Sequence, residues 1–213
     1  MSSAQPTSKD GWNHNIHYHP LISRAAPPGC ARALDVGCGR GLLARRLARQ
    51  CDQVIGIDAN PETLALAASS SPGVNYIEGD AMTYPFAPNS FDLITVVATL
   101  HHLPLTAALE RFRELLKPGG VLAVIGLYKL DTVADYAFAA IAKPISLIIR
   151  VVRPIAETSA PIREPATTLR AIRAACGQIL PGAVLRRRLF FRYSLIWRRP
   201  SPAVEPSRVL THA

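Results

Sequence analysis

Three glycines alternate with other residues in a short segment that begins with a carboxylate, Asp35-Val36-Gly37-Cys38-Gly39-Arg40-Gly41. Because glycine has no Cβ, such a segment can turn sharply and bring its backbone close to a ligand. A helix beginning at its end would also offer free N–H groups and the positive end of its dipole. The segment therefore predicts a binding site built largely from backbone.

Two later carboxylates indicate what the ligand is. Asp58 follows the apolar run Val54 to Ile57, where a carboxylate can accept both hydroxyls of a ribose. Asp80 follows the run Val74 to Ile77, in a position to accept from an exocyclic amine. A dinucleotide-binding loop would place its third glycine at position 42, which is Leu42 here. The pattern favours a nucleotide-containing ligand other than a dinucleotide.

Histidines form two further candidate groups. His101 and His102 follow the apolar run Phe91 to Val97, and open α/β sheets place their ligands at the ends of such strands. His101 is the candidate base or substrate hydrogen-bond partner and His102 a second substrate contact, with ordinary loop residues as the alternative for both. His14, His17 and His19 lie close together, but their spacings of three and two suit no single helix face, and we predict no metal site. We expect this segment to fold over the ligand crevice, with Tyr18 and His19 near cofactor or substrate; a packing helix is the alternative.

Strands and helices alternate along the first part of the chain. Apolar runs predict strands at 33–36, 54–57, 74–77, 91–97 and 121–127, and helical patterns fill 41–50, 61–69 and 105–116. Lys117-Pro118-Gly119-Gly120 is typical of a stop and turn after the last of these helices. This alternation predicts an α/β fold with a doubly wound, mostly parallel sheet.

The remainder of the chain has a different pattern. A very apolar helix is expected at 130–152, interrupted at Lys143-Pro144, and a second helix at 164–180. The β-like runs 183–191 and 192–198 are adjacent, so they must pair antiparallel and complete a seven-stranded sheet. We therefore predict one domain over 12–199, with a lid insertion at about 128–181 and disordered tails at 1–11 and 200–213.

Composition narrows the class of protein. Hydrophobic residues make up 49% of the 213 and charged residues 18%, which excludes global disorder. The four cysteines contain no C-x-x-C pair, so Cys30, Cys51 and Cys176 are interpreted as small hydrophobic residues and Cys38 as a small loop residue. The polar start of the chain shows no signal peptide, and we expect a cytoplasmic protein.

The net charge of +9 lies entirely in the last 86 residues. Residues 1–127 contain ten Lys+Arg and ten Asp+Glu, whereas residues 128–213 contain 14 and five. We expect the arginines at 186–188, 192, 198 and 199 to form a solvated basic surface. Without aromatic stacking platforms this surface does not predict a nucleic-acid partner. The apolar helix is interpreted as core packing, as a lid over a hydrophobic substrate, or as an interfacial helix on anionic lipid.

Five motifs carry a resemblance to a known family. ALDVGCGRG, VIGID, IEGDAM, FDLITVVATLHHL and ELLKPGGVLAV appear in this order over roughly residues 30–127. In these motifs the chain resembles the class I S-adenosylmethionine-dependent methyltransferases, nearest to the small-molecule branch that includes quinone-biosynthesis enzymes. The resemblance implies S-adenosylmethionine as cofactor.

The resemblance also implies roles for individual residues. Gly37, Gly39 and Gly41 would line the methionine part of the cofactor, and Asp35 would organise the site near its amino group. Asp58 would hold the ribose with Ala59 flanking the adenine, Asp80 would meet the adenine amine, Ala81 its ring, and Ala98 would place backbone near the methionine part. The alternative for the three carboxylates is a capping or turn role.

The expected activity is methyl transfer to O, N or C of a small, largely apolar metabolite. Two alternatives stay open: methylation of a lipid or quinone at a membrane surface, and a cofactor-binding partner protein without turnover. Base methylation is disfavoured because Ala98-Thr99-Leu100-His101 stands where an N-P-P-Y tetrapeptide would be expected. The sequence leaves the oligomeric state open.

Overall fold

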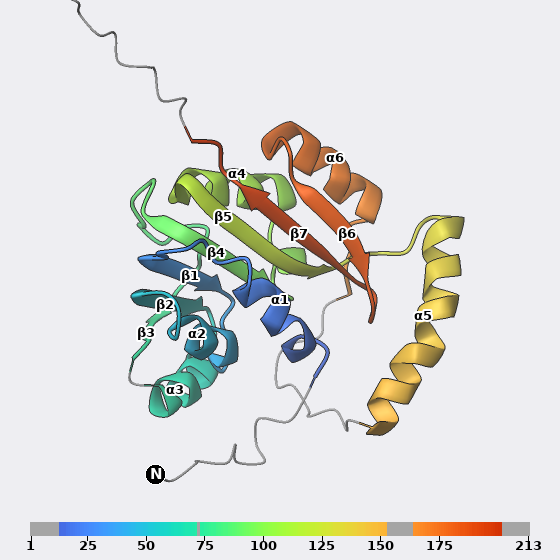
Figure 1. Ribbon diagram of the computed structural model, residues 1–213, viewed down its shortest axis with the longest axis horizontal. Coiled ribbons are helices and arrows are strands. Elements are labelled where there is room, and N and C mark those ends of the chain that lie inside the picture. The colour runs from blue at the N-terminus through green and yellow to red at the C-terminus, as the bar shows by residue number, and fades with distance from the viewer. Residues whose placement is uncertain (1–12, 72, 153–163, 202–213) are drawn as a thin grey trace, which may run out of the picture.

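A seven-stranded sheet forms the centre of the protein (Figure 1). The computed structural model describes residues 13–71, 73–152 and 164–201. Within the second range it describes the side chains of residues 73–144 and the helical backbone of residues 145–152. The strands lie in the order β3-β2-β1-β4-β5-β7-β6. Their bounds are β1 Arg32–Val36, β2 Gln53–Asp58, β3 Asn75–Glu78, β4 Phe91–Val97, β5 Leu116–Leu127, β6 Val184–Arg188 and β7 Arg192–Arg198.

Strands β1 to β5 are parallel, whereas β7 pairs antiparallel with both β5 and β6. The predicted mostly parallel sheet with an antiparallel end is therefore confirmed. Because the parallel strands share a direction, their carboxyl ends meet at one edge of the sheet, where β1 ends at Val36, β2 at Asp58 and β4 at Val97. That edge carries the predicted ligand site.

Helices cover both faces of the sheet (Figure 1). Leu34 and Val36 point into one apolar cluster, which includes side chains of α4 and α6, while Ala33 points into another with α1 and α2. This alternation follows from the two-residue period of a strand. The helices are η1 Ile16–Tyr18, α1 His19–Ser23, α2 Leu42–Leu47, α3 Pro61–Ser70, η2 Leu100–His102, α4 Leu105–Leu115, α5 Val133–Val152 and α6 Leu169–Ile179.

The predicted stop at Lys117-Pro118-Gly119-Gly120 is confirmed, but the turn lies inside a strand, as a bulge. Helix α4 ends at Leu115 and β5 begins at the next residue, so these four residues belong to the strand. Leu116 pairs with Phe91 of β4, and a Cβ at Gly120 would lie 3.0 Å from the carbonyl oxygen of Phe91. Four residues loop out between the pairs Leu116–Phe91 and Val121–Leu93, and Gly119 has a left-handed φ of 80° there. The two glycines thus serve the bulge as well as the close approach to the neighbouring strand.

The predicted interruption at Lys143-Pro144 is wrong. Helix α5 is continuous over Val133–Val152 with Pro144 inside it. A proline removes one helical hydrogen bond, to the carbonyl four residues earlier. That residue, Ala140, is exposed, so water can satisfy the freed carbonyl. No described helix is long and apolar enough to cross a membrane.

Two cysteines interpreted as small hydrophobic residues are joined in a disulfide, Cys30–Cys51. Cys30 stands before β1 and Cys51 before β2, and these strands are neighbours in the sheet. The bond closes a ring that contains β1, the glycine segment and α2. Cys38 and Cys176 are free thiols.

The expected solvated arginine surface is corrected in several places. Arg187 forms an ion pair with the buried Asp135, with 2.7 Å between Nη2 and Oδ1. Arg188 donates from Nε to Ser194 Oγ at 2.9 Å. Arg192 is buried and donates from Nη2 to Asn15 Oδ1 at 2.7 Å. These guanidinium groups connect elements of the fold, while Arg186 is exposed.

The predicted lid range also contains part of the core. Leu169, Ile172, Cys176 and Ile179 of α6 are buried in the same cluster as α4. The lid therefore stays a prediction for the segment around α5 alone. The predicted tails lie outside the described residues, apart from Pro200 and Ser201.

Candidate active site

The glycine segment leaves the carboxyl end of β1 in a conformation that favours glycine. Gly37, Gly39 and Gly41 have φ angles of 68°, 50° and 71°, in the left-handed region. Two backbone N–H groups, of Gly37 and Cys38, donate to the carbonyl oxygen of Ile57 at 2.8 and 3.2 Å. This ties the loop to β2, and α2 begins immediately after Gly41.

Side chains from two other strands lie against these glycines. A Cβ at Gly37 would overlap the side chain of Thr99, which follows β4. A Cβ at Gly41 would overlap the ring of Tyr76 in β3, and one at Gly56 would meet both Tyr76 and Cys38. The loop is therefore held between the ends of β3 and β4, and neither Thr99 nor Tyr76 was identified from the sequence.

Asp58 ends β2 and faces the loop. Its Oδ2 accepts a hydrogen bond from the backbone N–H of Gly39 at 2.7 Å, and its Oδ1 accepts from the N–H of Asn60 at 3.0 Å. Asn60 in turn caps α3, because its Oδ1 accepts from the N–H groups of Glu62 and Thr63. A carboxylate accepts about four hydrogen bonds, so Asp58 keeps room for further donors.

Asp35 lies deeper, with 2% of its surface exposed. Its Oδ1 accepts from Thr95 Oγ1 at 2.8 Å, and its Oδ2 is buried with no hydrogen-bond partner among the described residues. Burial raises the pKa of Asp35 to about 7; the bond from Thr95 and an interaction with the backbone N–H of Ala44 oppose this rise, and the charge of Asp58 adds to it. A buried carboxylate with an unused oxygen is suited to a cationic or hydrogen-bonding ligand group.

Asp80 and its neighbours form the turn after β3. Asp80 Oδ1 accepts from the N–H of Met82 at 2.9 Å, and its carbonyl oxygen accepts from the N–H of Tyr84 at 2.8 Å. Asp80 is exposed, Ala81 is buried, and Ala59 is exposed after β2. The turn role that the sequence left open for Asp80 is thus present, and the carboxylate is also accessible from solvent.

The end of β4 holds Ala98 in an uncommon conformation. Its φ is 53°, while its N–H donates to the carbonyl oxygen of Ile125 at 2.7 Å. Left-handed backbone at a non-glycine residue costs energy and occurs often at functional sites. η2 follows directly, with the ring centroids of His101 and His102 4.0 Å apart, His101 partly buried and His102 exposed.

The N-terminal segment packs beside this edge, but its predicted residues have structural partners. Tyr18 is buried and donates from its hydroxyl to the carbonyl oxygen of Leu189 in the β6–β7 turn at 3.0 Å. His19 begins α1 and is buried; burial and the charge of Arg46 lower its pKa to about 4. The packing helix that the sequence left as the alternative is present here.

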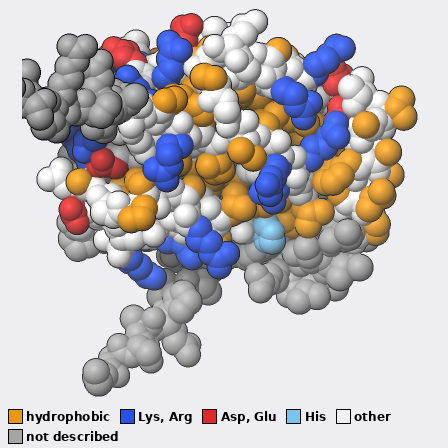
Figure 2. Space-filling view, turned by 45° about the horizontal axis from the view of Figure 1, so that its top comes forward, with side chains coloured by type: hydrophobic (Ala, Val, Ile, Leu, Met, Phe, Trp, Pro, Cys, Tyr) orange, Lys and Arg blue, Asp and Glu red, His pale blue; other side chains and the backbone are white. Residues whose placement is uncertain are grey.

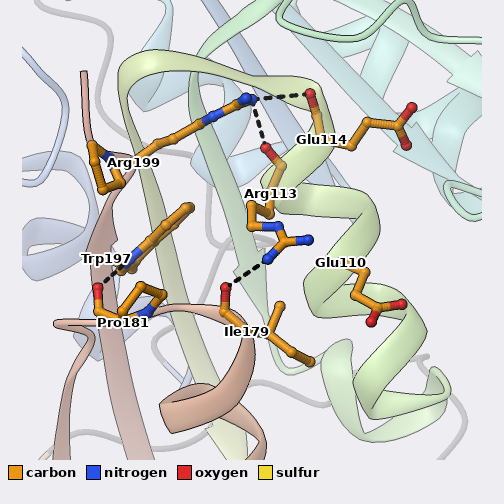
Figure 3. Close-up of a pocket in the computed structure, with 8 residues that line it drawn as sticks. Glu110, Arg113, Glu114, Ile179, Pro181, Trp197 and Arg199 are labelled. Carbon is orange, nitrogen blue, oxygen red and sulfur yellow. Dashed lines mark hydrogen bonds between the residues drawn. The ribbon is translucent and has the colours of Figure 1, made fainter. Parts of the chain in front are cut away.

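A cavity of about 400 Å³ lies at the other end of the sheet (Figure 3). Trp197 pairs with Leu122 near the start of β5, so this cavity is far along the strands from the glycine loop. Two of its polar side chains are engaged: Trp197 Nε1 donates to the carbonyl oxygen of Pro181 at 3.0 Å, and Arg113 Nη1 donates to that of Ile179 at 3.2 Å. We interpret the cavity as a packing gap between α4, α6 and β7.

The strand order and the glycine loop together define a class I S-adenosylmethionine-dependent methyltransferase fold. The residues at this edge fit that cofactor: Asp35 has an unused buried oxygen, and Gly37 lies against the side chain of Thr99, the residue after Ala98. No group of three metal-ligating side chains occurs in the described ranges.

Comparisons with known proteins agree with this class. Residues 34–124 match the family model described as "Methyltransferase domain". An uncharacterized methyltransferase of Mycobacterium tuberculosis is 36% identical over 89% of this chain and 98% of its own length. The 2-phytyl-1,4-naphthoquinone methyltransferase of Thermosynechococcus vestitus is 40% identical over 53% of each chain. The N-methyltransferase NodS of Bradyrhizobium japonicum, solved with S-adenosyl-L-homocysteine, has the same fold, with a TM-score of 0.62, 17% identity and 94% coverage of each chain.

The chain belongs to the S-adenosylmethionine-dependent methyltransferase family. It is an enzyme of this class, with S-adenosylmethionine as its cofactor.

Proposed function

We propose that this enzyme transfers a methyl group to O, N or C of a small, largely apolar metabolite, with quinone-like molecules as the favoured class. Relatives of similar sequence act on such molecules. Besides the naphthoquinone enzyme, a ubiquinone biosynthesis O-methyltransferase of Xanthomonas campestris is 40% identical over 57% of this chain and 52% of its own. The segment around α5, beside the same sheet edge, is rich in apolar residues.

The observation that carries the cofactor site is the pair of carboxylates around the glycine loop. Asp58 would accept the ribose hydroxyls, since it ends β2 and has hydrogen-bonding capacity beyond Gly39 and Asn60. Asp35 would orient the amino group of the cofactor through its unused buried oxygen. Gly37, Gly39, Gly41 and Ala98 would supply close backbone, and Ala59, Asp80 and Ala81 the adenine end.

When bound, the cofactor supplies an electrophilic methyl group on a sulfonium. The protein has little chemistry to add beyond alignment and exclusion of water, which contribute about 7–11 kcal/mol in well-oriented reactions. A base is needed only if the acceptor arrives protonated. His101 is our candidate for that base or for a substrate hydrogen bond, with His102 as a second substrate contact. Tyr18 and His19 would hold in place the N-terminal segment that packs beside this edge.

Calorimetric titration with S-adenosylmethionine tests the cofactor site. Asp58→Ala removes two charge-assisted hydrogen bonds to the ribose, and we expect affinity to fall at least about a hundredfold. Asp52→Ala is the matched control, because Asp52 is an exposed carboxylate before the same strand. Equal affinity in both variants would contradict the assignment of Asp58, and NADH binding would contradict the choice of nucleotide.

Methyl acceptance is tested separately, by formation of S-adenosyl-L-homocysteine with a panel of quinols, phenols and amines. If His101 is a base, His101→Gln lowers kcat about a hundredfold or more and removes one limb of the pH profile, while His102→Gln does not. Cofactor binding without turnover on any acceptor would favour the alternative of a non-catalytic partner protein.

A small-molecule acceptor rather than a nucleic acid remains our proposal for the partner, together with a cytoplasmic location. The disulfide bears on the location, because such bonds are rare in reducing compartments. Counting the thiols of denatured protein taken from each compartment shows in which one the disulfide is formed.

A further inference from the structure

Helix α5 has two faces of different character, and its inner face is anchored. Asp135, Ala139 and Ala142 are buried, at a spacing of three to four residues that places them on one side of a helix. Figure 1 shows α5 standing to one side of the sheet, and no described helix or strand packs extensively against it. The hydrogen bonds that attach it to β6 are those of its first turn.

Those contacts centre on Asp135, which is 1% exposed. Its Oδ1 accepts from Arg187 Nε and Nη2 at 3.1 and 2.7 Å. Its Oδ2 accepts from the backbone N–H of Thr132 at 3.2 Å, and Thr132 Oγ1 accepts from the N–H of Asp135 at 3.1 Å. This reciprocal pairing is a capping box. An ion pair with two hydrogen bonds to one oxygen and a cap at the same residue fix the rotation of α5, and so determine which side faces outward.

The outward side is apolar and uncovered. Val133, Tyr136 and Ile141 are 87%, 60% and 68% exposed, and the neighbouring Ala137, Ala140 and Pro144 are exposed as well. These six side chains form the outer face of α5. Figure 2 shows hydrophobic side chains gathered along its right-hand edge, the side on which Figure 1 places α5. Such a contiguous patch marks an interaction surface.

The charge around this face identifies its partner. Lys129 precedes α5 and Lys143 lies within it, and both side chains are exposed. Figure 2 shows many more Lys and Arg than Asp and Glu side chains on the adjoining surface. A second copy would bring like charges together, whereas anionic lipid headgroups complement them.

We infer that the outer face of α5 docks this enzyme onto an anionic lipid bilayer, lying in the interface with its apolar side toward the acyl chains. The inference rests on the proposed function in one respect, since a docked enzyme takes its lipophilic acceptor from the bilayer. Docking itself requires no methyl transfer, so the two are measured independently.

Vesicle flotation of the full chain tests the inference, with phosphatidylcholine vesicles compared with vesicles containing 30% phosphatidylglycerol. Wild type should float with the anionic vesicles, and Tyr136→Ser with Ile141→Ser should reduce the bound-to-free ratio at least about tenfold. The matched control is Leu66→Ser with Val184→Ser, two side chains 51% and 50% exposed elsewhere, which should float like wild type. Lys143→Gln should reduce binding about fivefold.

Three outcomes would overturn the inference: no flotation of wild type, equal loss in the control pair, or unchanged flotation of the α5 pair. Sedimentation velocity tests the main competing occupant, a second copy of the chain. If wild type is a dimer that Tyr136→Ser with Ile141→Ser converts to monomer, and no vesicle binds, the outer face joins two copies. All variants should bind S-adenosylmethionine like wild type. Lost flotation with intact cofactor binding rejects the docking alone, while lost cofactor binding in wild type rejects the proposed function.

Discussion

The two regions of this enzyme use their charged side chains for different purposes. In the front region, residues 13–127, Asp35 and Asp58 face the sheet edge and accept from Thr95 and from backbone N–H groups, with capacity left for a ligand. In the back region, residues 128–201, Arg187 and Arg192 are committed to partners inside the fold. A near-neutral region thus carries the carboxylates with capacity for a ligand, and these arginines of the strongly basic region connect parts of the fold.

The comparison shows that the net charge of a region differs from the charge that is left for a partner. Arg199 shows this clearly: its Nη1 donates to the carbonyl oxygens of Arg113 and Glu114 at the end of α4. Cations near a helix C-terminus stabilise the unpaired carbonyls there. The basic charge left for a partner in the back region therefore comes from other side chains, such as Lys129, Lys143 and Arg186.

The largest effect is expected in the front region, at Gly37. Gly37→Ala combines left-handed strain with overlap onto the Thr99 side chain, and should lower the free energy of unfolding by about 3–4 kcal/mol. Gly29 has nearly the same φ, 66°, with nothing within 4 Å of the position a Cβ would take, so Gly29→Ala isolates the strain at about 1–2 kcal/mol. Equal losses in urea denaturation would show that the contact with Thr99 does not constrain the loop.

Reduction of Cys30–Cys51 should have the next largest effect. Opening a ring with 21 residues of separation should lower the free energy of unfolding by about 3 kcal/mol. The variant with both cysteines replaced by serine should not respond to reductant. Denatured, unreduced protein should show two reactive thiols, Cys38 and Cys176, and four would contradict the disulfide.

Arg192, which is buried, and Arg186, which is exposed, test the comparison within the back region. Arg192→Met leaves Asn15 Oδ1 and the carbonyl oxygen of Phe190 without their donor, and should cost about 2 kcal/mol of unfolding free energy. Arg186→Met removes the same charge from an exposed position of the adjacent strand and should change it by less than about 0.5 kcal/mol. Similar losses in the two variants would mean that the back-region arginines act through net charge.

The elements of the front region follow from local sequence. Buried parallel strands are nearly continuous apolar runs: β4 has the predicted bounds, β1 begins one residue earlier, and β2 is one residue longer at each end. The site residues that end these strands, such as Asp58, were predicted because strand ends locate the ligand edge. Leu116, by contrast, extends β5 through a local turn signal by pairing with Phe91, and such pairing is not visible in a local pattern.

Long-range partners account for most of what the sequence did not predict. Cys30 and Cys51 each look like small apolar residues, and their bond becomes evident only when β1 and β2 are adjacent. Thr95 holds Asp35 because the register of β1 and β4 places them opposite one another. A sequence search for polar residues at that register position of β4 would have found Thr95.

The smallest effect concerns pH and two buried groups of the front region that titrate in opposite senses. Asp35 has its folded pKa raised to about 7, so its contribution to stability is present at low pH and is lost as pH rises from about 4 to 7. His19 has its folded pKa lowered to about 4, so its contribution is lost as pH falls from about 6.5 to 4. Between pH 5.5 and 6.5 the two slopes oppose each other.

Single variants should therefore reveal how the free energy of unfolding that each group contributes depends on pH. In the difference from wild type, Asp35→Asn makes the free energy of unfolding rise with pH, and His19→Gln makes it fall, by at most about 1.4 kcal/mol over this one pH unit. Urea denaturation at pH 5.5, 6.0 and 6.5 measures both. Because an S-adenosylmethionine amino group would favour the ionised carboxylate, cofactor affinity in wild type should also weaken toward pH 5.5, and this dependence should be absent in Asp35→Asn. A pH-independent affinity in wild type would place the carboxylate of Asp35 outside the reach of the cofactor and leave it with a structural role at Thr95.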